Sequence, residues 1–305
     1  MKKYLLYALS ICSDIDLLIA DDICRLPDDA PCEITIRRNS LTPDDLIAKK
    51  PLTSEYSKNF CWFKSRIGYI TIKYGHEINV YPEGTPSDIE LSAFILGWGL
   101  AFLFYQRDGL GIHCTGLFGN GQAFLICGDS GAGKSTTAFK LLERGYRFLN
   151  DDIAFLSEKD SFLLHPAFPV QKMCRNVAET VNDKTRLKYI DEDKDKFAYL
   201  NTEHFENAPH PLAFLFSIGI GSNITSLKHR EESGLDKVRT ILDNLFMNPL
   251  FESDGFPNNV MAATLKLSSK IRVVRIMRPN NQDTVEEMCS VIESYLSKAS
   301  HISYD

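Results

Sequence analysis

The stretch Gly128-Asp129-Ser130-Gly131-Ala132-Gly133-Lys134-Ser135 decides the fold class of this chain. It matches the pattern G-x-x-x-x-G-K-[S/T] in full, and a match arises by chance in about one chain of this length in a hundred. The apolar run Ala123–Cys127 precedes it, and a helical pattern at Lys134–Leu142 follows, with Gly145 just beyond the helix end. The sequence therefore predicts a strand, a phosphate-binding loop and a helix in direct succession.

The residue types of this loop suit the phosphates of ATP or a close analogue. Gly131 and Gly133 let backbone N–H groups turn inward, and the start of the following helix adds a favourable dipole. Lys134 supplies a cation for the outer phosphates, and the Ser135 hydroxyl can ligate Mg²⁺. An ordinary glycine-rich turn is the alternative. The residues expected to bind nucleotide are Gly128, Asp129, Ser130, Gly131, Ala132, Gly133, Lys134, Ser135 and Thr136.

A hairpin signal places a histidine beside this loop. Gly119-Asn120-Gly121-Gln122 fits a type I′ turn with Asn120 and Gly121 at its centre. If Gly119 pairs with Gln122, the register sets His113 opposite Gly128. A histidine there could adjust the proton affinity of a carboxylate neighbour. A histidine that is simply satisfied at a strand edge is an equally good interpretation.

Two adjacent aspartates follow the strand expected at Tyr146–Asn150. If this strand runs parallel to Ala123–Cys127, Asp151 and Asp152 lie at the sheet edge where ligands bind in open α/β sheets. One carboxylate could accept the proton of an attacking hydroxyl, and the other could hold metal directly or through water. A solvated turn is the usual interpretation of such a pair, but the position after the strand favours a site.

Composition limits the classes of partner. The net charge of −6 over 305 residues argues against a general nucleic-acid binder. The eight cysteines show no C-x-x-C spacing, which indicates reduced thiols in a cytosolic protein. Met1–Cys12 is interpreted as a first strand and not as a secretion signal, and Ser92–Tyr105 is too short to span a bilayer. We therefore expect a cytoplasmic protein without nucleic-acid or membrane partners.

The chain divides into two regions by pattern. Residues 1–87 carry short extended stretches separated by turns, which predicts a small strand-rich N-terminal domain. In residues 88–305, a buried helix at about Asp88–Arg107 leads into alternating strands and helices, which predicts an α/β domain with parallel strands. In the last third, strands are expected at Leu212–Ile220 and Ile271–Met277, and helices at Leu235–Phe246 and Thr284–Leu296.

The sequence contains neither the N-K-x-D motif of G-proteins nor the L-S-G-G-Q element of ABC-type ATPases. Three segments together resemble the catalytic region of HPr kinase/phosphorylase-like proteins: Ile112-His113-Cys114, Gly128–Ser135 and Arg144-Gly145-Tyr146-Arg147-Phe148-Leu149-Asn150-Asp151-Asp152. The close match covers about Gly111–Leu156. The opening Tyr4–Asp16 and the overall length look like one branch of this family, found with biosynthesis clusters for ribosomal peptides such as lasso peptides.

This resemblance implies a P-loop (HPr kinase-like) kinase domain and ATP-dependent phosphorylation of a serine hydroxyl on a peptide or protein. It makes Asp151 the base, with His113 as its partner and Lys134 as a further catalytic residue, and it puts Asp152 and Ser135 on the metal side. In one departure, Thr136 stands where HPr kinases usually have Glu. In another, the C-terminal glycine-arginine motif tied to the phosphorylase reaction is not recognisable. Both departures count against HPr as the substrate.

Other residues are weaker candidates. Lys194 and Lys196 offer cations for the transferred phosphoryl group, although the charged stretch at residues 182–196 is more simply an exposed loop. His165–Pro169 could line an acceptor groove, but a plain connecting turn is the simpler interpretation. Trp98 is expected to pack in the core or at the surface and not to bind a ligand.

The leading prediction is a cytoplasmic kinase that uses MgATP to phosphorylate a serine of a ribosomally made precursor peptide. One alternative is a kinase of free serine or another small hydroxyl metabolite. Another is a regulator that binds nucleotide without turnover. The N-terminal region is a candidate for substrate recognition, and a homo-oligomer is compatible with the resemblance because HPr kinases form assemblies.

Overall fold

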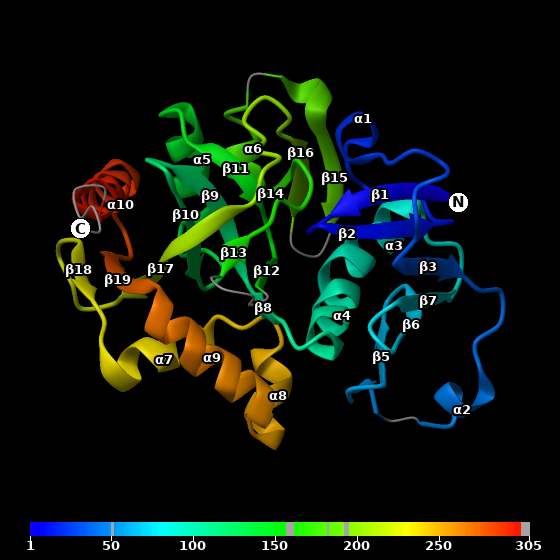
Figure 1. The fold of residues 1–305 in the computed structure, drawn as a ribbon. Coiled ribbons are helices and arrows are strands. Elements are labelled where there is room, and N and C mark those ends of the chain that lie inside the picture. Colours follow the sequence, from blue (N-terminus) through cyan, green and yellow to red (C-terminus); the bar gives the residue numbers. More distant parts are fainter. Residues whose placement is uncertain (50–51, 157–161, 182, 192–194, 300–305) are drawn as a thin grey trace.

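The computed structural model describes residues 1–49, 52–156, 162–181, 183–191 and 195–299. Within these residues the chain is a mixed α/β protein with two large and two small sheets (Figure 1). A helix separates the two large sheets and consists of α3 (Asp88–Phe94), a π-helical turn η1 (Ile95–Gly99) and α4 (Leu100–Gln106). The mixed α/β class predicted from the sequence is confirmed.

The N-terminal residues form a seven-stranded sheet in the order β1-β2-β3-β7-β6-β5-β4. Its strands and short helices are β1 (Lys2–Leu6), β2 (Leu9–Ser13), α1 (Asp21–Cys24), β3 (Ile34–Arg38), α2 (Asp44–Ile47), β4 (Ser54–Glu55), β5 (Phe60–Ser65), β6 (Gly68–Lys73) and β7 (Glu77–Pro82). The pairs β2–β3 and β3–β7 are parallel. The region is strand-rich as expected, while its separation from the rest of the chain at residue 87 stays a prediction.

The parallel pairing of β2 with β3 brings two cysteines together. Cys12 lies in β2 and Cys32 precedes β3, and they form a disulfide with 5.8 Å between their Cα atoms. The expectation that all eight cysteines are reduced is therefore wrong for this pair. Twenty positions separate the two residues, so only the strand pairing reveals the bond.

The central helix is buried, as its sequence indicates. It begins with a capping box, in which the Ser87 hydroxyl accepts from the Glu90 N–H and the Glu90 carboxylate accepts from the Ser87 N–H. The stretch Asp88–Gln106 is long and apolar enough to cross a membrane, but 67% of its apolar window is buried inside the structure. Its side chains join one continuous core with Ile70 of the N-terminal sheet and Val273 of the second large sheet. It is therefore a core helix.

The second large sheet carries the glycine-rich loop. Its strand order is β11-β9-β10-β17-β19-β18, with β13 also paired to β17. The strands are β9 (Cys114–Gly119), β10 (Gln122–Gly128), β11 (Arg147–Asn150), β13 (Leu163–Leu164), β17 (His210–Gly221), β18 (Lys228–Glu231) and β19 (Arg272–Pro279). The neighbours β10, β17 and β19 are parallel. Since β9 pairs antiparallel with both β10 and β11, β11 also runs parallel to β10, as predicted.

Helices cover both faces of this second sheet (Figure 1). One face packs against α5 (Lys134–Glu143) and α10 (Val285–Ala299), whose apolar side chains share a core with the sheet. The other face shares its core with α7 (Gly234–Asp243), α8 (Asn248–Asp254) and α9 (Asn258–Lys270). The strands and helices expected in the last third of the chain are all present, with ends shifted by a few residues.

Two small sheets complete the described structure. One pairs β8 (Leu110–Ile112) with β12 (Ala154–Leu156). The other has the order β14-β16-β15, and its elements are β14 (Val170–Cys174), α6 (Arg175–Ala178), η2 (Lys184–Arg186), β15 (Leu187–Asp191) and β16 (Lys196–Leu200). The expectation of an exposed loop at residues 182–196 is wrong for β15, because its pairing with β16 makes it a strand and buries Ile190.

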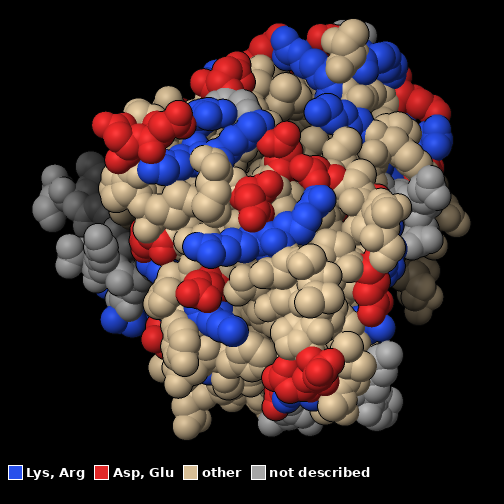
Figure 2. All heavy atoms as spheres, turned by 90° about the vertical axis from the view of Figure 1, so that its right-hand side faces the viewer, with Lys and Arg blue, Asp and Glu red and all other residues tan. Residues whose placement is uncertain are grey.

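Acidic and basic side chains are interspersed on the face that carries the N-terminal sheet (Figure 2). Among the described residues, Lys2 pairs with Asp16 at 2.7 Å, and Arg66 pairs with Glu90 at 2.7 Å. Such exposed pairs contribute little stability, but they neutralise charge locally. The described residues therefore form no broad surface of one sign on this face.

Candidate functional site

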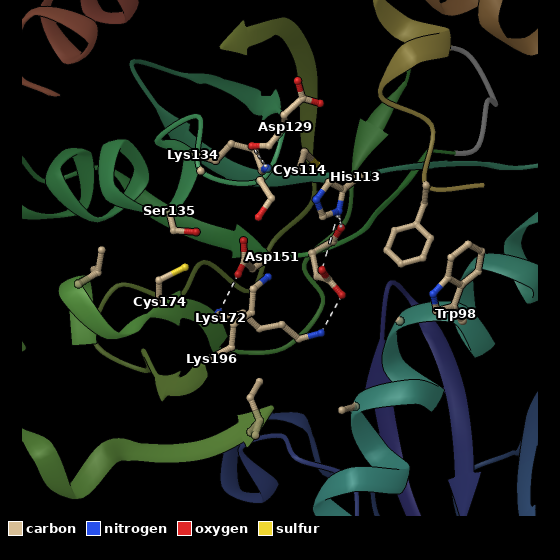
Figure 3. A pocket seen from close by; sticks show the side chains of 18 of the residues that line it. Trp98, His113, Cys114, Asp129, Lys134, Ser135, Asp151, Lys172, Cys174 and Lys196 are labelled. Carbon is tan, nitrogen blue, oxygen red and sulfur yellow. Dashed lines mark hydrogen bonds and ion pairs between the residues drawn. The ribbon is translucent and has the colours of Figure 1, made fainter. Parts of the chain in front are cut away.

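A pocket of about 890 Å³ opens where the glycine-rich loop, the two aspartates and the central helix meet (Figure 3). The residues of the predicted site that line it are His113, Asp129, Ser130, Gly131, Gly133, Lys134, Ser135, Thr136, Asp151 and Asp152. Gly128 and Ala132 do not line it, because Gly128 ends a strand against Ile218 and the Ala132 side chain is fully buried. The structure thus brings together all but two of the residues chosen from sequence.

The backbone of the loop requires glycine at several positions. Gly128, Gly131 and Gly133 have φ angles of 132°, 81° and 108°, which disfavour any side chain. A Cβ on Gly128 would lie 2.1 Å from the Ile218 carbonyl oxygen. Helix α5 begins directly afterwards at Lys134, so its first N–H groups face the end of the loop. The strand–loop–helix unit has the geometry expected from the sequence, and its binding of phosphate stays a prediction.

Two cations hold the carbonyl groups of the loop. Arg278, from the distant strand β19, donates from Nε to the Ala132 carbonyl at 2.8 Å and from Nη2 to the Gly131 carbonyl at 3.0 Å. Lys134 Nζ donates to the carbonyl of Asp129 at 3.0 Å and also to that of Gly128. The Ala132 N–H is itself bonded to the Asp129 carbonyl at 3.1 Å, so this bond and the two cations together hold the conformation of the loop. Arg278 was not found by sequence reasoning, since only the sheet brings it here.

The two aspartates occupy different electrostatic environments. Asp151 is buried, and its carboxylate accepts from the Thr115 hydroxyl at 2.5 Å and from the Lys172 backbone N–H at 2.7 Å. Burial raises the pKa of Asp151, and the neighbouring Asp152 charge adds to this. Burial also opposes ionisation of Asp152, but the Lys172 ammonium at 2.7 Å, with His113, holds the pKa of Asp152 far below its usual range. Pairs whose pKa values are pushed apart in this way suit an acid–base division of roles.

His113 lies at the break between β8 and β9. Its backbone N–H donates to the Asn244 carbonyl at 2.8 Å. The hairpin register, in which Cys127 pairs with Cys114, confirms that His113 is next to the phosphate loop. Its Nδ1 lies 2.9 Å from the Asp152 carbonyl oxygen and 3.8 Å from Asp152 Oδ1. Burial lowers the pKa of His113, which favours the neutral ring.

The hydrogen-bond partner of the His113 ring is therefore Asp152, whereas the expected partnership of His113 with Asp151 stays a prediction. The backbone explains the contact with Asp152. Asp152 has a φ angle of 69°, a left-handed conformation that is uncommon outside glycine and more readily adopted by aspartate. This turn accompanies the hydrogen bond between its carbonyl and the histidine ring.

Lys172 is the main site residue that sequence reasoning missed. It lies in β14, and its side chain lines the pocket together with Lys196 of β16. The sequence signal was weak, because β14 has only five residues and matches no motif around Lys172. Of the two lysines considered as phosphoryl-binding cations, Lys196 therefore reaches the pocket, while Lys194 lies outside the described residues. The segment His165–Pro169 does not line the pocket and acts as a packed connection.

Aromatic side chains form the wall of the pocket beside the aspartates. Trp98 and Phe246 line the pocket with ring centroids 5.1 Å apart, and Phe94 lines it from the same helix as Trp98. Trp98 is only partly buried, so the expectation that it serves packing alone misses its exposure to the cavity. No group of three or more His, Cys, Asp or Glu side chains able to hold a metal occurs among the described residues.

The loop, the lysine at the helix start and the paired carboxylates give this site the features of phosphate-binding α/β proteins. No protein-family model matches the chain. The chain is similar to the HPr kinase/phosphorylases of two Clostridium botulinum strains, Eklund 17B and Alaska E43. Each is 44% identical over 45 residues, which is 15% of this chain and 15% of the relative. The family resemblance noted in the sequence is confirmed over this short length only.

A solved structure also shows similarity to the chain. The Hpr(Ser) kinase/phosphatase from Coxiella burnetii matches 62% of this chain and 92% of its own chain, with 14% sequence identity and a TM-score of 0.33. At this score the likeness supports no further conclusion. The resemblance to the branch associated with lasso peptides stays a prediction.

Proposed function

We propose that this protein is a kinase that transfers the terminal phosphoryl group of ATP to a serine hydroxyl. The observation that carries the proposal is the convergence of the glycine-rich loop, Lys134 and the Asp151–Asp152 pair on one pocket. The short similarity to HPr kinase/phosphorylases supports the same reaction class. The whole activity is a proposal, because the chain spans only 15% of the length of those relatives.

The loop residues bind the nucleotide in this proposal. The N–H groups of the loop and of the first turn of α5 donate hydrogen bonds to phosphate oxygens. Lys134 leaves its carbonyl partners to neutralise the outer phosphates. Burial lowers the pKa of Lys134, because the ammonium group is poorly solvated in the site. A bound phosphate would supply the negative charge that stabilises this ammonium group, which contributes to the affinity for nucleotide.

The donor set at the pocket fits Mg²⁺. The Ser135 hydroxyl and the Asp152 carboxylate line one pocket and are hard oxygen ligands. Mg²⁺ is usually held by one or two carboxylates together with substrate phosphates, so a complete protein cage is not needed. When bound, the ion neutralises charge on the phosphate oxygens. For Asp152 to serve it, its contact with Lys172 must be exchanged, which leaves the Lys172 ammonium free for a phosphate oxygen.

Asp151 is the proposed base. Its raised pKa makes it the better proton acceptor of the two carboxylates, because Asp152 is held ionised by Lys172. The hydrogen bonds from Thr115 and from the Lys172 N–H fix the orientation of its carboxylate. His113 contacts the turn at Asp152 and also interacts electrostatically with Asp151, so it stays the proposed partner of the base.

The acceptor is proposed to be a serine of a ribosomally made peptide. Thr136 in place of the usual glutamate, and the lack of a recognisable phosphorylase motif, separate this chain from enzymes acting on HPr. The partly open pocket between the loop and the central helix leaves room for a chain segment. Free serine, another small hydroxyl metabolite and nucleotide sensing without transfer remain the alternatives, each separated by the assay below. Location in the cytoplasm and assembly into a homo-oligomer are further proposals.

The test is phosphate transfer from radiolabelled MgATP to pools of serine-containing peptides, with free serine and other small hydroxyl metabolites in parallel. Binding of a fluorescent ATP analogue is measured on the same samples. We expect transfer by the native protein, and Asp151→Asn should lower turnover by about 10²–10⁴-fold with little change in nucleotide affinity. The matched control is Asp28→Asn, because the Asp28 side chain is 85% exposed and does not line the pocket. Tight nucleotide binding with no transfer to any acceptor would instead establish a sensor.

A further inference from the structure

The pocket has two chemically different ends on either side of the aspartates. Figure 3 shows Ser135 and Cys174 on one side of Asp151, and Trp98 on the other. The first end consists of the loop, the start of α5 and the adjoining β14. The second end consists of the central helix, Phe246 and the β5–β6 turn. The two substrates of a transfer reaction therefore have separate places to lie.

The aromatic end is on the acceptor side if the proposed function holds. The nucleotide extends from the loop, so its outermost phosphate points to the aspartates. An acceptor hydroxyl must attack roughly in line, from the side opposite to the leaving oxygen. That side is the aromatic end. The helix there approaches Asp152 and Phe246 closely at Gly97, where an added Cβ would lie 3.5 Å from Asp152 Oδ2 and 3.8 Å from the Phe246 ring.

The aromatic wall is rigidly supported. Trp98 lies 6.0 Å from Phe102 and 6.5 Å from Phe63 by ring centroids, and Phe63 belongs to the N-terminal sheet. Phe246 lies 5.8 Å from the His113 ring, so the wall continues to the phosphate loop. The π-helical turn that presents Trp98 is a feature that often marks functional sites. A preorganised aromatic surface of this kind suits an apolar side chain.

The charges at this end are already balanced. Among the described residues that line it, Arg66 pairs with Glu90 at 2.7 Å. Asp152 pairs with Lys172 at 2.7 Å. In the nucleotide complex proposed above, Asp152 and Lys172 exchange this contact for Mg²⁺ and phosphate, so the ammonium and carboxylate groups of a free amino acid would have to displace the Arg66–Glu90 pair or compete with the nucleotide. A serine within a peptide has neither charge, so the lining favours a peptide.

We infer that Trp98 and Phe246 form an acceptor subsite that selects a serine next to an aromatic or large aliphatic residue in a peptide. The inference rests on the proposed function for the direction of the nucleotide, but it makes a separate claim about binding. Trp98 and Phe246 are specificity-determining residues and take no part in the proton transfer. The N-terminal sheet contributes to recognition through Phe63 behind Trp98 and through the β5–β6 turn.

The experiment has a transfer arm and a binding arm. In the transfer arm, peptides with one serine carry Phe, Leu, Ala or Glu at the neighbouring positions, and free serine is included. In the binding arm, labelled peptides with Ser replaced by Ala are titrated in the presence of an unreactive ATP analogue. The variants are Trp98→Ala and Phe246→Ala, and the matched control is Tyr74→Ala, since Tyr74 is 63% exposed and does not line the pocket.

We expect peptides with Phe or Leu beside the serine to be preferred over Ala or Glu by about tenfold. Trp98→Ala and Phe246→Ala should each raise KM and the peptide Kd by about tenfold, with kcat and nucleotide affinity nearly unchanged. Tyr74→Ala should change none of these. A preference that survives both pocket variants, or equal use of free serine, would overturn the inference.

The two arms separate the inference from the proposed function. If no acceptor is phosphorylated but apolar peptides bind and lose affinity in Trp98→Ala, the subsite stands and the kinase proposal fails. If transfer occurs but peptide binding is indifferent to both aromatic residues, the kinase proposal stands and the subsite fails. Absence of both transfer and selective binding overturns both.

Discussion

The ion pair between Lys172 and Asp152 gives a sharp prediction about stability. The Lys172 and Asp152 side chains are only 21% and 19% exposed, and their charged atoms are 2.7 Å apart. In Lys172→Met the Asp152 carboxylate keeps its burial and loses its counter-ion, and it still faces Asp151. Removing one partner of a buried pair costs about 3–5 kcal/mol. Because each side chain retains some exposure, we expect a loss near the lower end, about 3 kcal/mol of unfolding free energy at pH 7.5.

The sign of the pH dependence follows from the pKa of Asp152. In the native protein this pKa is lowered on folding, so the pair stabilises the fold above the unfolded pKa, and this contribution disappears as pH falls through the folded pKa. In Lys172→Met, burial and the neighbouring Asp151 oppose ionisation of Asp152 and only His113 and Lys196 still favour it, so we expect the folded pKa of Asp152 to rise above its unfolded value. The variant should then recover stability as pH falls and Asp152 takes up a proton. The difference between variant and native protein is expected to be largest at neutral pH and to shrink towards pH 5.

Urea unfolding of both proteins at pH 7.5 and pH 5 measures this difference. Lys228→Met is the matched control because Lys228 is exposed on β18, and its unfolding free energy should change by less than about 0.5 kcal/mol. The double variant Lys172→Met/Asp152→Asn removes the stranded charge, and asparagine tolerates the left-handed backbone of Asp152. It should regain most of the loss. Equal instability of the single and double variants, or a loss independent of pH, would refute the reasoning.

Three further outcomes are expected. Gly128→Ala should lower the unfolding free energy by about 3 kcal/mol, because the new Cβ would lie 2.1 Å from the Ile218 carbonyl oxygen. Gly131→Ala has open space around the new Cβ and should lower it by about 1 kcal/mol. Thermal unfolding of the two variants measures the difference. Arg278→Gln should weaken binding of a fluorescent ATP analogue about tenfold, since the loop must then be ordered on binding. Arg272 lies on the same strand as Arg278 and pairs with Glu231 of β18, and Arg272→Gln should leave that affinity unchanged. Turnover of the native protein should fall as pH drops through the raised pKa of Asp151, because the base is then protonated. In pH–rate profiles of Asp151→Asn, this fall on the acid side should be absent from the remaining activity.

Local signals predicted the parts of the site that are close in sequence. The Asn120-Gly121 pair adopts φ angles of 52° and 76°, as the type I′ turn requires, and it sets the register that places His113. The glycines of the loop and the helix start at Lys134 also follow from local backbone requirements. The sequence also predicted that β10 and β11 end at the same edge of the sheet, because the helix between them lets both strands run in the same direction. This holds even though β9 lies between them in the sheet.

The remaining parts of the site depend on contacts between distant segments. Lys172 reaches Asp152 because β14 packs beside the aspartates, and its own neighbours in sequence give no sign of this. Arg278 supports the loop from a strand that is parallel to β17 and separated from β10 by it. Trp98 and Phe246 meet only through the fold. The same holds for the disulfide between Cys12 and Cys32. No periodicity or spacing in a single sequence encodes such pairs.

The bond from Arg278 to the loop has a consequence for the order in which the protein becomes active during synthesis. The loop at Gly131 is translated early, whereas β17, β19 and Arg278, which flank and support it, are translated in the last third of the chain. Because segments fold as they leave the ribosome, a nascent chain that ends before β19 should have the whole nucleotide motif and still bind nucleotide weakly. If the loop binds nucleotide as proposed, ribosome-bound or truncated chains would therefore reach full nucleotide affinity only after β19 has been made.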